Sequence, residues 1–218
     1  MYKVFKAVMD RLLALLGLIV LFLPLLIVAI AIRLDSKGPA IFKQQRVGKD
    51  GKSFMCYKFR TMYSTHVATT ADNPIVTDDN KNLTKVGRNI RKLKIDEFLQ
   101  LINVLKGEMS LIGPRPFMSI HTESFEPWET QKFAVKPGMS GLSQIKGNVY
   151  LSSVERSYYD VIYAKKPNLL LDTEILFKTI GVMLVGEKKF LEHVPADKIN
   201  ELRLEYAKRR NTNTKKLY

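Results

Sequence analysis

The chain has 218 residues, of which 35 are Lys or Arg and 21 are Asp or Glu, so its formal net charge is +14. This excess of cations indicates an anionic partner, such as nucleic acid, anionic lipid or a phosphorylated substrate. The single cysteine, Cys56, excludes a disulfide scaffold and a cysteine-based metal cluster, and the 46% hydrophobic content excludes a disordered chain.

Residues 12–32 form an apolar run without a charged side chain. As a helix this run would be about 32 Å long, against a hydrocarbon core of about 30 Å. A cleaved signal peptide, a spanning helix and a re-entrant hairpin are the three alternatives, and the run is long for the first of them. Pro24, near the middle, is expected to bend or break the helix, although kinked spanning helices also occur. Cations flank both ends of the run, which favours the hairpin.

Two strands are predicted at 40–47 and 52–62, joined by a turn that contains an Asp-Gly pair. Period-two alternation places Lys58 and Arg60 on one face of the second strand. These two cations either decorate a solvated edge strand or form a cradle for phosphate.

The rest of the chain is predicted to be mostly helical. A polar segment at 63–82 has the composition of a loop. A short basic helix is expected at 84–93, and an amphipathic helix at 95–106 that ends near Gly107. Further helices are expected at 151–164, 172–185 and 196–210. The pattern therefore predicts a mainly α fold with a small β-hairpin element.

Two irregular segments interrupt these helices. The sequence Gly-Pro-Arg-Pro at 113–116 contains two prolines that fix the backbone around Arg115. A glycine-punctuated loop covers residues 136–148. The first of these segments cannot form a regular helix or strand.

Asp96 and Glu97 open the predicted helix at 95–106. Adjacent helical residues point about 100° apart, so the two carboxylates cannot both pack inward. Acidic residues often do no more than stabilise a first helical turn. Here, however, the pair lies among cations, namely Arg88, Arg91, Lys92, Lys94 and Arg115. Ionised carboxylates among cations suit a divalent metal and a phosphorylated substrate, and a carboxylate can also attack phosphorus as a nucleophile.

Together these segments resemble the bacterial sugar transferases of the small monotopic phosphoglycosyl transferase family, from about residue 2 to about residue 186. No single segment is specific, but the set is. The resemblance rests on RVGKDGKSFMCYKFRTM at 46–62, LTKVGRNIRKLKIDEFLQLINVLKGEMSLIGPRP at 83–116, KPGMSGLSQIKGN at 136–148 and YDVIYAKKPNLLLD at 159–172.

The resemblance implies a reaction in two steps. The Asp96 carboxylate attacks the β-phosphorus of a UDP-sugar and expels UMP, and polyprenyl (undecaprenyl) phosphate then takes the sugar-phosphate from the enzyme. The resemblance also implies Mg²⁺ as cofactor, with Asp96 and Glu97 at the metal. It implies substrate-binding roles for six further side chains, namely Lys58, Arg60, Arg91, Arg115, Gln144 and Asp160.

The resemblance further implies a monotopic protein of the bacterial inner membrane, which starts the assembly of a polysaccharide or glycoconjugate. A re-entrant helix, broken at Pro24, and its flanks would occupy residues 1–36. A catalytic domain on the cytoplasmic face would occupy 37–190, and a charged helix and basic tail 191–218. The expected partners are a UDP-sugar, polyprenyl phosphate and the lipid bilayer, without nucleic acid, and a homodimer is left open.

Two positions depart from the family pattern. Leu23 stands where Ser often precedes the helix-breaking proline, so the bend loses a hydroxyl that could bond a freed main-chain group. Asn148 stands where Arg usually ends the glycine loop, and Lys146 is the candidate to replace that cation.

The alternative function is a membrane-tethered basic protein that binds nucleic acid or an acidic glycan. It accounts for the net charge and the apolar run. It does not account for a rigid Pro-Arg-Pro segment beside a carboxylate pair, and the sequence carries no signature of a common nucleic-acid-binding module. Release of UMP from UDP-sugars would separate the two functions.

Overall fold

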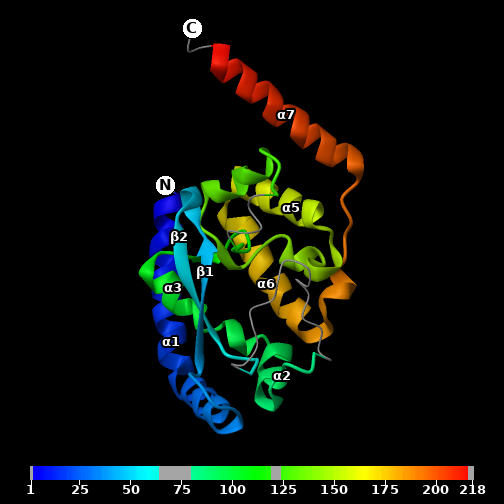
Figure 1. Cartoon of the computed structure of the whole chain (residues 1–218). Helices are drawn as coiled ribbons and strands as arrows, with labels where there is room; N and C mark the ends of the chain where they lie inside the picture. The colour runs from blue at the N-terminus through cyan, green and yellow to red at the C-terminus, as the bar shows by residue number, and fades with distance from the viewer. Residues whose placement is uncertain (1, 64–79, 119–123, 216–218) are drawn as a thin grey trace.

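The structure is a computed structural model that describes residues 2–63, 80–118 and 124–215, with the backbone alone for 211–215. Helices dominate, and a two-stranded hairpin lies beside the long N-terminal helix (Figure 1). The predicted mainly α fold with a small β-hairpin is therefore confirmed. Of the loop predicted at 63–82, residues 64–79 lie outside the described parts.

A single helix, α1 (Tyr2–Asp35), contains the whole apolar run. The helix continues through Pro24, so the predicted break at this residue is wrong. A proline removes one main-chain N–H and crowds the carbonyl of the preceding turn, and a helix can absorb both effects by bending. The axis of α1 turns toward its C-terminal end in Figure 1, in agreement with a bend rather than a break.

The predicted hairpin is formed by β1 (Ile41–Val47) and β2 (Ser53–Phe59), which pair in antiparallel register, but β2 ends before Arg60 and is shorter than predicted. Asp50 in the turn adopts a left-handed conformation with φ 56°. At the edge that does not pair with β1, β2 is held by Asn103. Its side chain accepts a hydrogen bond from the N–H of Tyr57 at 3.0 Å and donates to the carbonyl of Met55 at 2.7 Å. These bonds satisfy main-chain groups of an edge strand and attach the hairpin to the next helix.

Helix α2 (Lys85–Lys92) begins at Thr84, whose hydroxyl accepts from the N–H of Gly87 at 2.9 Å. The helix predicted at 95–106 is instead divided. A 3-10 turn at Ile95–Glu97 carries the carboxylate pair, and α3 covers Gln100–Lys106. Helix α3 ends at Gly107, which has φ 80°, as predicted.

A short parallel pair, β3 (Ser110–Ile112) and β4 (Gly138–Ser140), was not predicted. Three residues are too few to show period-two alternation. The pair depends on glycine, because a Cβ on Gly138 would lie 2.1 Å from the main-chain N of Gly113. The glycines of the 136–148 loop therefore serve a close contact between backbones.

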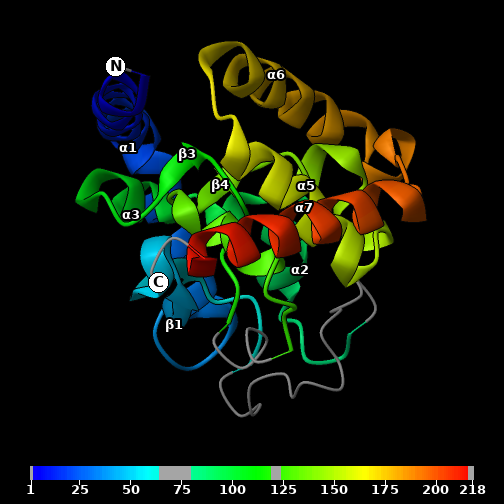
Figure 2. The same ribbon diagram turned by 90° about the horizontal axis from the view of Figure 1, so that it is seen from above.

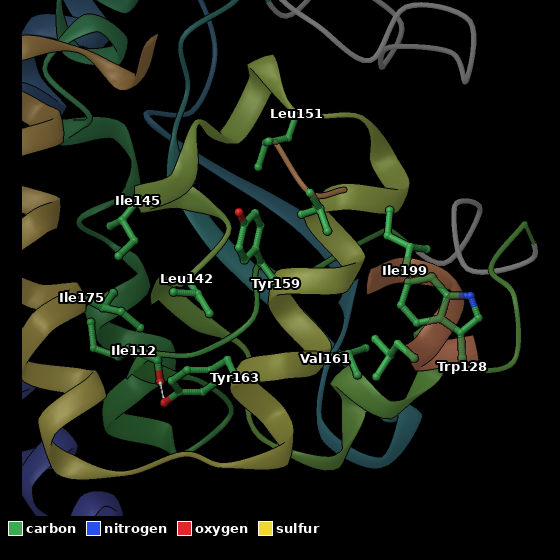
Figure 3. Close-up of a cluster of buried hydrophobic side chains, with 12 residues drawn as sticks. Ile112, Trp128, Leu142, Ile145, Leu151, Tyr159, Val161, Tyr163, Ile175 and Ile199 are labelled. Carbon is green, nitrogen blue, oxygen red and sulfur yellow. Dashed lines mark hydrogen bonds between the residues drawn. The ribbon is translucent and has the colours of Figure 1, made fainter. Parts of the chain in front are cut away.

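The C-terminal half contains the three predicted helices, which the structure places at α5 (Ser153–Lys165), α6 (Leu169–Val185) and α7 (Ala196–Lys215). Their buried side chains pack with those of earlier segments in the cluster shown in Figure 3, in which Tyr163 donates to the carbonyl of Ile112 at 3.1 Å. Helix α7 extends away from the other helices in Figure 1, and the view from above looks down on it (Figure 2). Short 3-10 turns join the elements at Lys49–Gly51, Glu129–Ala134, Gln144–Lys146, Asn148–Tyr150 and Glu187–Phe190.

One side of α1 packs against this body and the other side is open. Ala14 and Ile32 are fully buried against the hairpin, α2 and α3. The opposite side exposes large apolar side chains along most of the helix, including Leu16, Ile19, Val20, Phe22, Leu23 and Ile27. Exposure of this extent points to contact with a partner or a membrane.

We expect Gly138→Ala to destabilise the fold by more than about 2 kcal/mol, because the new methyl group would overlap the backbone of Gly113. Gly51→Ala is the matched control. It has φ 75° and no atom within 4 Å of the added Cβ, so only the backbone cost of about 1 kcal/mol applies. Thermal unfolding in detergent measures both, and an equal loss in the two variants would contradict this account of the β3–β4 contact.

Candidate active site

Glu97 lies at the meeting point of three separate segments. The Nζ of Lys58, on β2, donates to its Oε1 at 2.7 Å, and the Nη2 of Arg115 donates to the same oxygen at 2.8 Å. The Glu97 and Lys58 side chains are only 15% and 18% exposed. The structure thus joins three of the predicted site residues in one ion cluster, which we call the Glu97 bridge.

The bridge fixes the charge of Glu97. Burial by itself raises the pKa of a carboxyl group, but Arg115 and Lys58 outweigh this effect and hold the pKa of Glu97 well below its ordinary value. In return, the Glu97 carboxylate raises the pKa of Arg115. Glu97 and Arg115 are therefore both ionised at neutral pH.

Asp96 has a different environment from its neighbour. It is 7% exposed, and its Oδ1 has no hydrogen-bond partner among the described residues. Burial, followed by the charge of Glu97, raises the pKa of Asp96 to about 6, against the opposing effect of Lys58, Arg91 and Lys94. An unpartnered buried carboxylate oxygen is costly unless a ligand or a reacting atom uses it.

The donor set at the carboxylate pair offers few ligands for Mg²⁺ from the protein itself. Among the described residues, no three His, Cys, Asp or Glu side chains gather as a metal site. Mg²⁺ does not need such a cage, because one or two carboxylates together with substrate phosphates commonly bind it. The free Oδ1 of Asp96 fits this role. The oxygens of Glu97 face Lys58 and Arg115, so Glu97 is the weaker candidate.

The backbone before the carboxylate pair is strained. Lys94 adopts a left-handed conformation with φ 59°, which ends α2 and starts the turn of Asp96 and Glu97. A residue other than glycine pays about 1–3 kcal/mol for such a conformation, and the surrounding structure must hold it. Arg91, in the last turn of α2, is half-buried and close enough to lower the pKa of Asp96.

The segment that carries Arg115 is held on both sides. The N–H of Gly138 donates to the carbonyl of Pro114 at 2.8 Å. On the other side, Arg46 of β1 donates to the carbonyl of Pro116 at 3.2 Å. Sequence reasoning missed Arg46, because its role depends on a contact between segments that are far apart in the chain.

Asp160 belongs to a second charged group nearby. It is 1% exposed, accepts from the hydroxyl of Ser143 at 2.8 Å, and its Oδ2 has no partner among the described residues. Burial raises the pKa of Asp160 to about 6, although Lys132 and Arg115 oppose this. Lys132 was not predicted. It is itself buried and lies 3.5 Å from the ring centroid of Phe125.

Arg60 does not join the site. Its guanidinium donates to the carbonyls of Ser36 at 2.8 Å and of Ile32 and Lys37, and the side chain is 6% exposed. These carbonyls lie at the C-terminal end of α1, where a cation is favoured. The geometry therefore gives Arg60 a structural role in place of the expected substrate-binding role.

The glycine loop contributes polar groups rather than an open cation. Gln144 donates to the carbonyl of Met139 at 3.3 Å, while its Oε1 is buried without a partner among the described residues. Lys146, the expected replacement for the family's arginine, forms an ion pair with Glu192. Asn148 donates to Glu187 at 2.9 Å. Lys146 is thus already paired with a carboxylate, and Asn148 is neutral, so neither supplies the cation that the family's arginine would offer to a phosphate.

The family model described as "Bacterial sugar transferase" matches residues 1–186. A UDP-N-acetylgalactosamine-undecaprenyl-phosphate N-acetylgalactosaminephosphotransferase from Aeromonas hydrophila is 40% identical over 85% of the chain and 45% of the relative. A UDP-glucose:undecaprenyl-phosphate glucose-1-phosphate transferase from Caulobacter vibrioides is 36% identical over 85% of the chain and 72% of the relative.

A third relative is an uncharacterized sugar transferase from Bacillus subtilis, which is 40% identical over 77% of the chain and 81% of the relative. The chain spans less than half the length of several curated relatives, with 45%, 38% and 41% coverage in three of them.

We expect Glu97→Gln to lower the free energy of unfolding by about 2 kcal/mol at pH 7 without added Mg²⁺, because Lys58 and Arg115 lose their shared anion. Since the folded pKa of Glu97 is depressed, its contribution is present above the unfolded pKa of about 4.3 and is lost as pH falls below it. Denaturant unfolding at pH 7 and at lower pH measures this. A difference between wild type and variant that stays constant on acidification would contradict the bridge.

Proposed function

The chain belongs to the bacterial sugar transferase family, and on this premise we propose that it transfers a sugar-1-phosphate from a UDP-sugar to polyprenyl phosphate and releases UMP. The names of two relatives, which act on undecaprenyl phosphate, support this class of reaction. The observation that carries the proposal is the buried Asp96, with an open oxygen, beside the Glu97 bridge.

Asp96 is the proposed nucleophile. One of its carboxylate oxygens forms a bond to the β-phosphorus, and the bond from that phosphorus to the bridging oxygen breaks, so UMP leaves with the electron pair. An oxygen of polyprenyl phosphate then attacks the same phosphorus and releases the Asp96 carboxylate. Burial supports the assignment, because Asp96 is removed from bulk water but stays largely ionised at neutral pH with a pKa of about 6.

Arg115 and Lys58 are proposed to bind the diphosphate, with Glu97 as the residue that positions them. Arg115 is 35% exposed, and its guanidinium has more N–H groups than the Glu97 carboxylate uses. Arg91 would add positive charge at the Asp96 side. We also propose Mg²⁺ as cofactor, held by Asp96 with the substrate phosphates, where it would neutralise negative charge at the reacting phosphorus.

The contacts of α1 support a re-entrant, monotopic attachment to the membrane. Near its N-terminus, Asp10 accepts a hydrogen bond from Ser110 at 2.5 Å. At its C-terminus, Asp35 accepts from the N–H of Val86 at 2.9 Å. Both ends of the helix thus touch one polar body, which can lie on only one face of a bilayer. A straight spanning helix would place these ends on opposite faces, about 30 Å apart.

A second apolar surface supports lipid contact. Helix α6 exposes large apolar side chains, with Leu170 at 84%, Leu184 at 79% and Phe177 at 67% exposure. Single exposed apolar residues are ordinary, but a row along one helix is not. We propose that this face and the open side of α1 contact the bilayer, with the catalytic body in the cytoplasm. The domain boundaries and a homodimer stay predictions.

Wild type incubated with its UDP-sugar but without polyprenyl phosphate should gain the mass of one sugar-phosphate on the peptide that contains Asp96. A panel of UDP-sugars, scored by UMP release, would identify the substrate. Asp96→Asn should abolish both signals, and Asp96→Glu should lose about a hundredfold in rate, because one methylene displaces the attacking oxygen by about 1 Å.

Asp50→Asn is the matched control for Asp96→Asn. It makes the same chemical change at an exposed turn of the hairpin, so it should keep full activity. A label on another residue, or substantial UMP release by Asp96→Asn, would overturn the assignment of the nucleophile. A complete lack of UMP release in wild type would instead favour a binding protein.

For the topology we expect Lys3→Cys and Lys37→Cys, each in a Cys56→Ser background, to be protected from an impermeant maleimide in intact spheroplasts. Both positions are exposed in the structure, so both should react once the cells are permeabilised. Reaction of only one of the two cysteines from outside would show a spanning helix and contradict the re-entrant attachment.

A further inference from the structure

We infer that Glu187 is a positioning residue that ties the segment after α6 to the two loops beside the candidate active site. The inference rests on the proposed function for its catalytic consequence. Glu187 follows directly after the segment matched by the family model, which ends at residue 186. It opens the 3-10 turn Glu187–Phe190.

One carboxylate oxygen of Glu187 makes both contacts. The Nζ of Lys94 donates to Oε1 at 2.9 Å, and the Nδ2 of Asn148 donates to the same atom at 2.9 Å. The Glu187 side chain is 14% exposed and Asn148 is 6% exposed, so the second bond is shielded from water. The three residues come from segments that are far apart in the chain.

Both partners of Glu187 themselves have a strained backbone conformation. Lys94 has φ 59° and leads directly into Asp96 and Glu97, and Asn148 has φ 44° and closes the glycine loop. Gly186, directly before Glu187, has φ 88° and ψ 153°, a region that is open essentially only to glycine. Three unusual backbone conformations thus meet at one carboxylate, and strain of this kind persists only where neighbouring groups hold it.

Glu187 is expected to act by positioning the two loops rather than by the strength of its ion pair. Lys94 is 48% exposed, so its ion pair with Glu187 by itself contributes little to stability. The shared oxygen, however, links the turn of Asp96 to the glycine loop, whose Ser143 donates a hydrogen bond to Asp160. Loss of Glu187 would leave the fold largely intact and would loosen the geometry that an in-line attack requires.

The experiment combines kinetics with hydrogen exchange. Glu187→Ala should slow single-turnover UMP release about tenfold while KM for the UDP-sugar changes less than twofold. Amide exchange should rise in peptides covering 94–97 and 143–148 but not in α7. Asn148→Ala should reproduce part of the effect, and the double variant should be less than additive, because the two residues share one bond.

Glu205→Ala is the control, because it also removes an acidic partner of a lysine, Lys165, but in α7. It should leave the rate and the exchange of both peptides unchanged. Unchanged rate and exchange in Glu187→Ala would overturn the inference. If wild type releases no UMP with any UDP-sugar, the exchange result still decides: increased exchange at 94–97 and 143–148 supports the positioning link and rejects only the proposed function.

Discussion

The arrangement of the site depends on one buried carboxylate that is shared by two cations. Glu97 accepts from Lys58 of the hairpin and from Arg115 of the Pro-Arg-Pro segment, and so holds together three parts of the chain. Removing one member of such a cluster leaves the other charges uncompensated in a poorly solvated place. The same bridge separates the two neighbouring carboxylates chemically. Glu97 is committed to its cations, while Asp96 keeps an oxygen open.

Main-chain contacts bring the parts of this bridge within reach. Gly138 can approach Gly113 because neither carries a Cβ, and this contact places the Arg115 segment against the glycine loop. On the opposite side, Arg60 binds carbonyls at the end of α1 and Asn103 binds the edge of β2. Helix α1 and the rest of the chain are thus connected by polar contacts.

The sequence determined the elements and the type of chemistry. Its periodicity and turn residues predicted the hairpin, α2 and the three C-terminal helices, because these follow from local backbone preferences. The run of cations around Asp96 and Glu97 indicated a phosphate site. Resemblance to the sugar transferases identified the family that the comparisons then confirmed.

The tertiary structure decided how individual side chains are used. Arg60 and Lys58 share a strand face in the sequence pattern, but only Lys58 reaches Glu97, while Arg60 meets the carbonyls at the end of α1. Arg46, Lys132 and Glu187 carry no local signal, since their partners lie far along the chain. Pro24 shows the same limit, because local preference allowed a bend or a break there, and the structure shows a continuous helix. Local preference sets which elements form, but the partner of a buried charge depends on which segments the whole fold brings together.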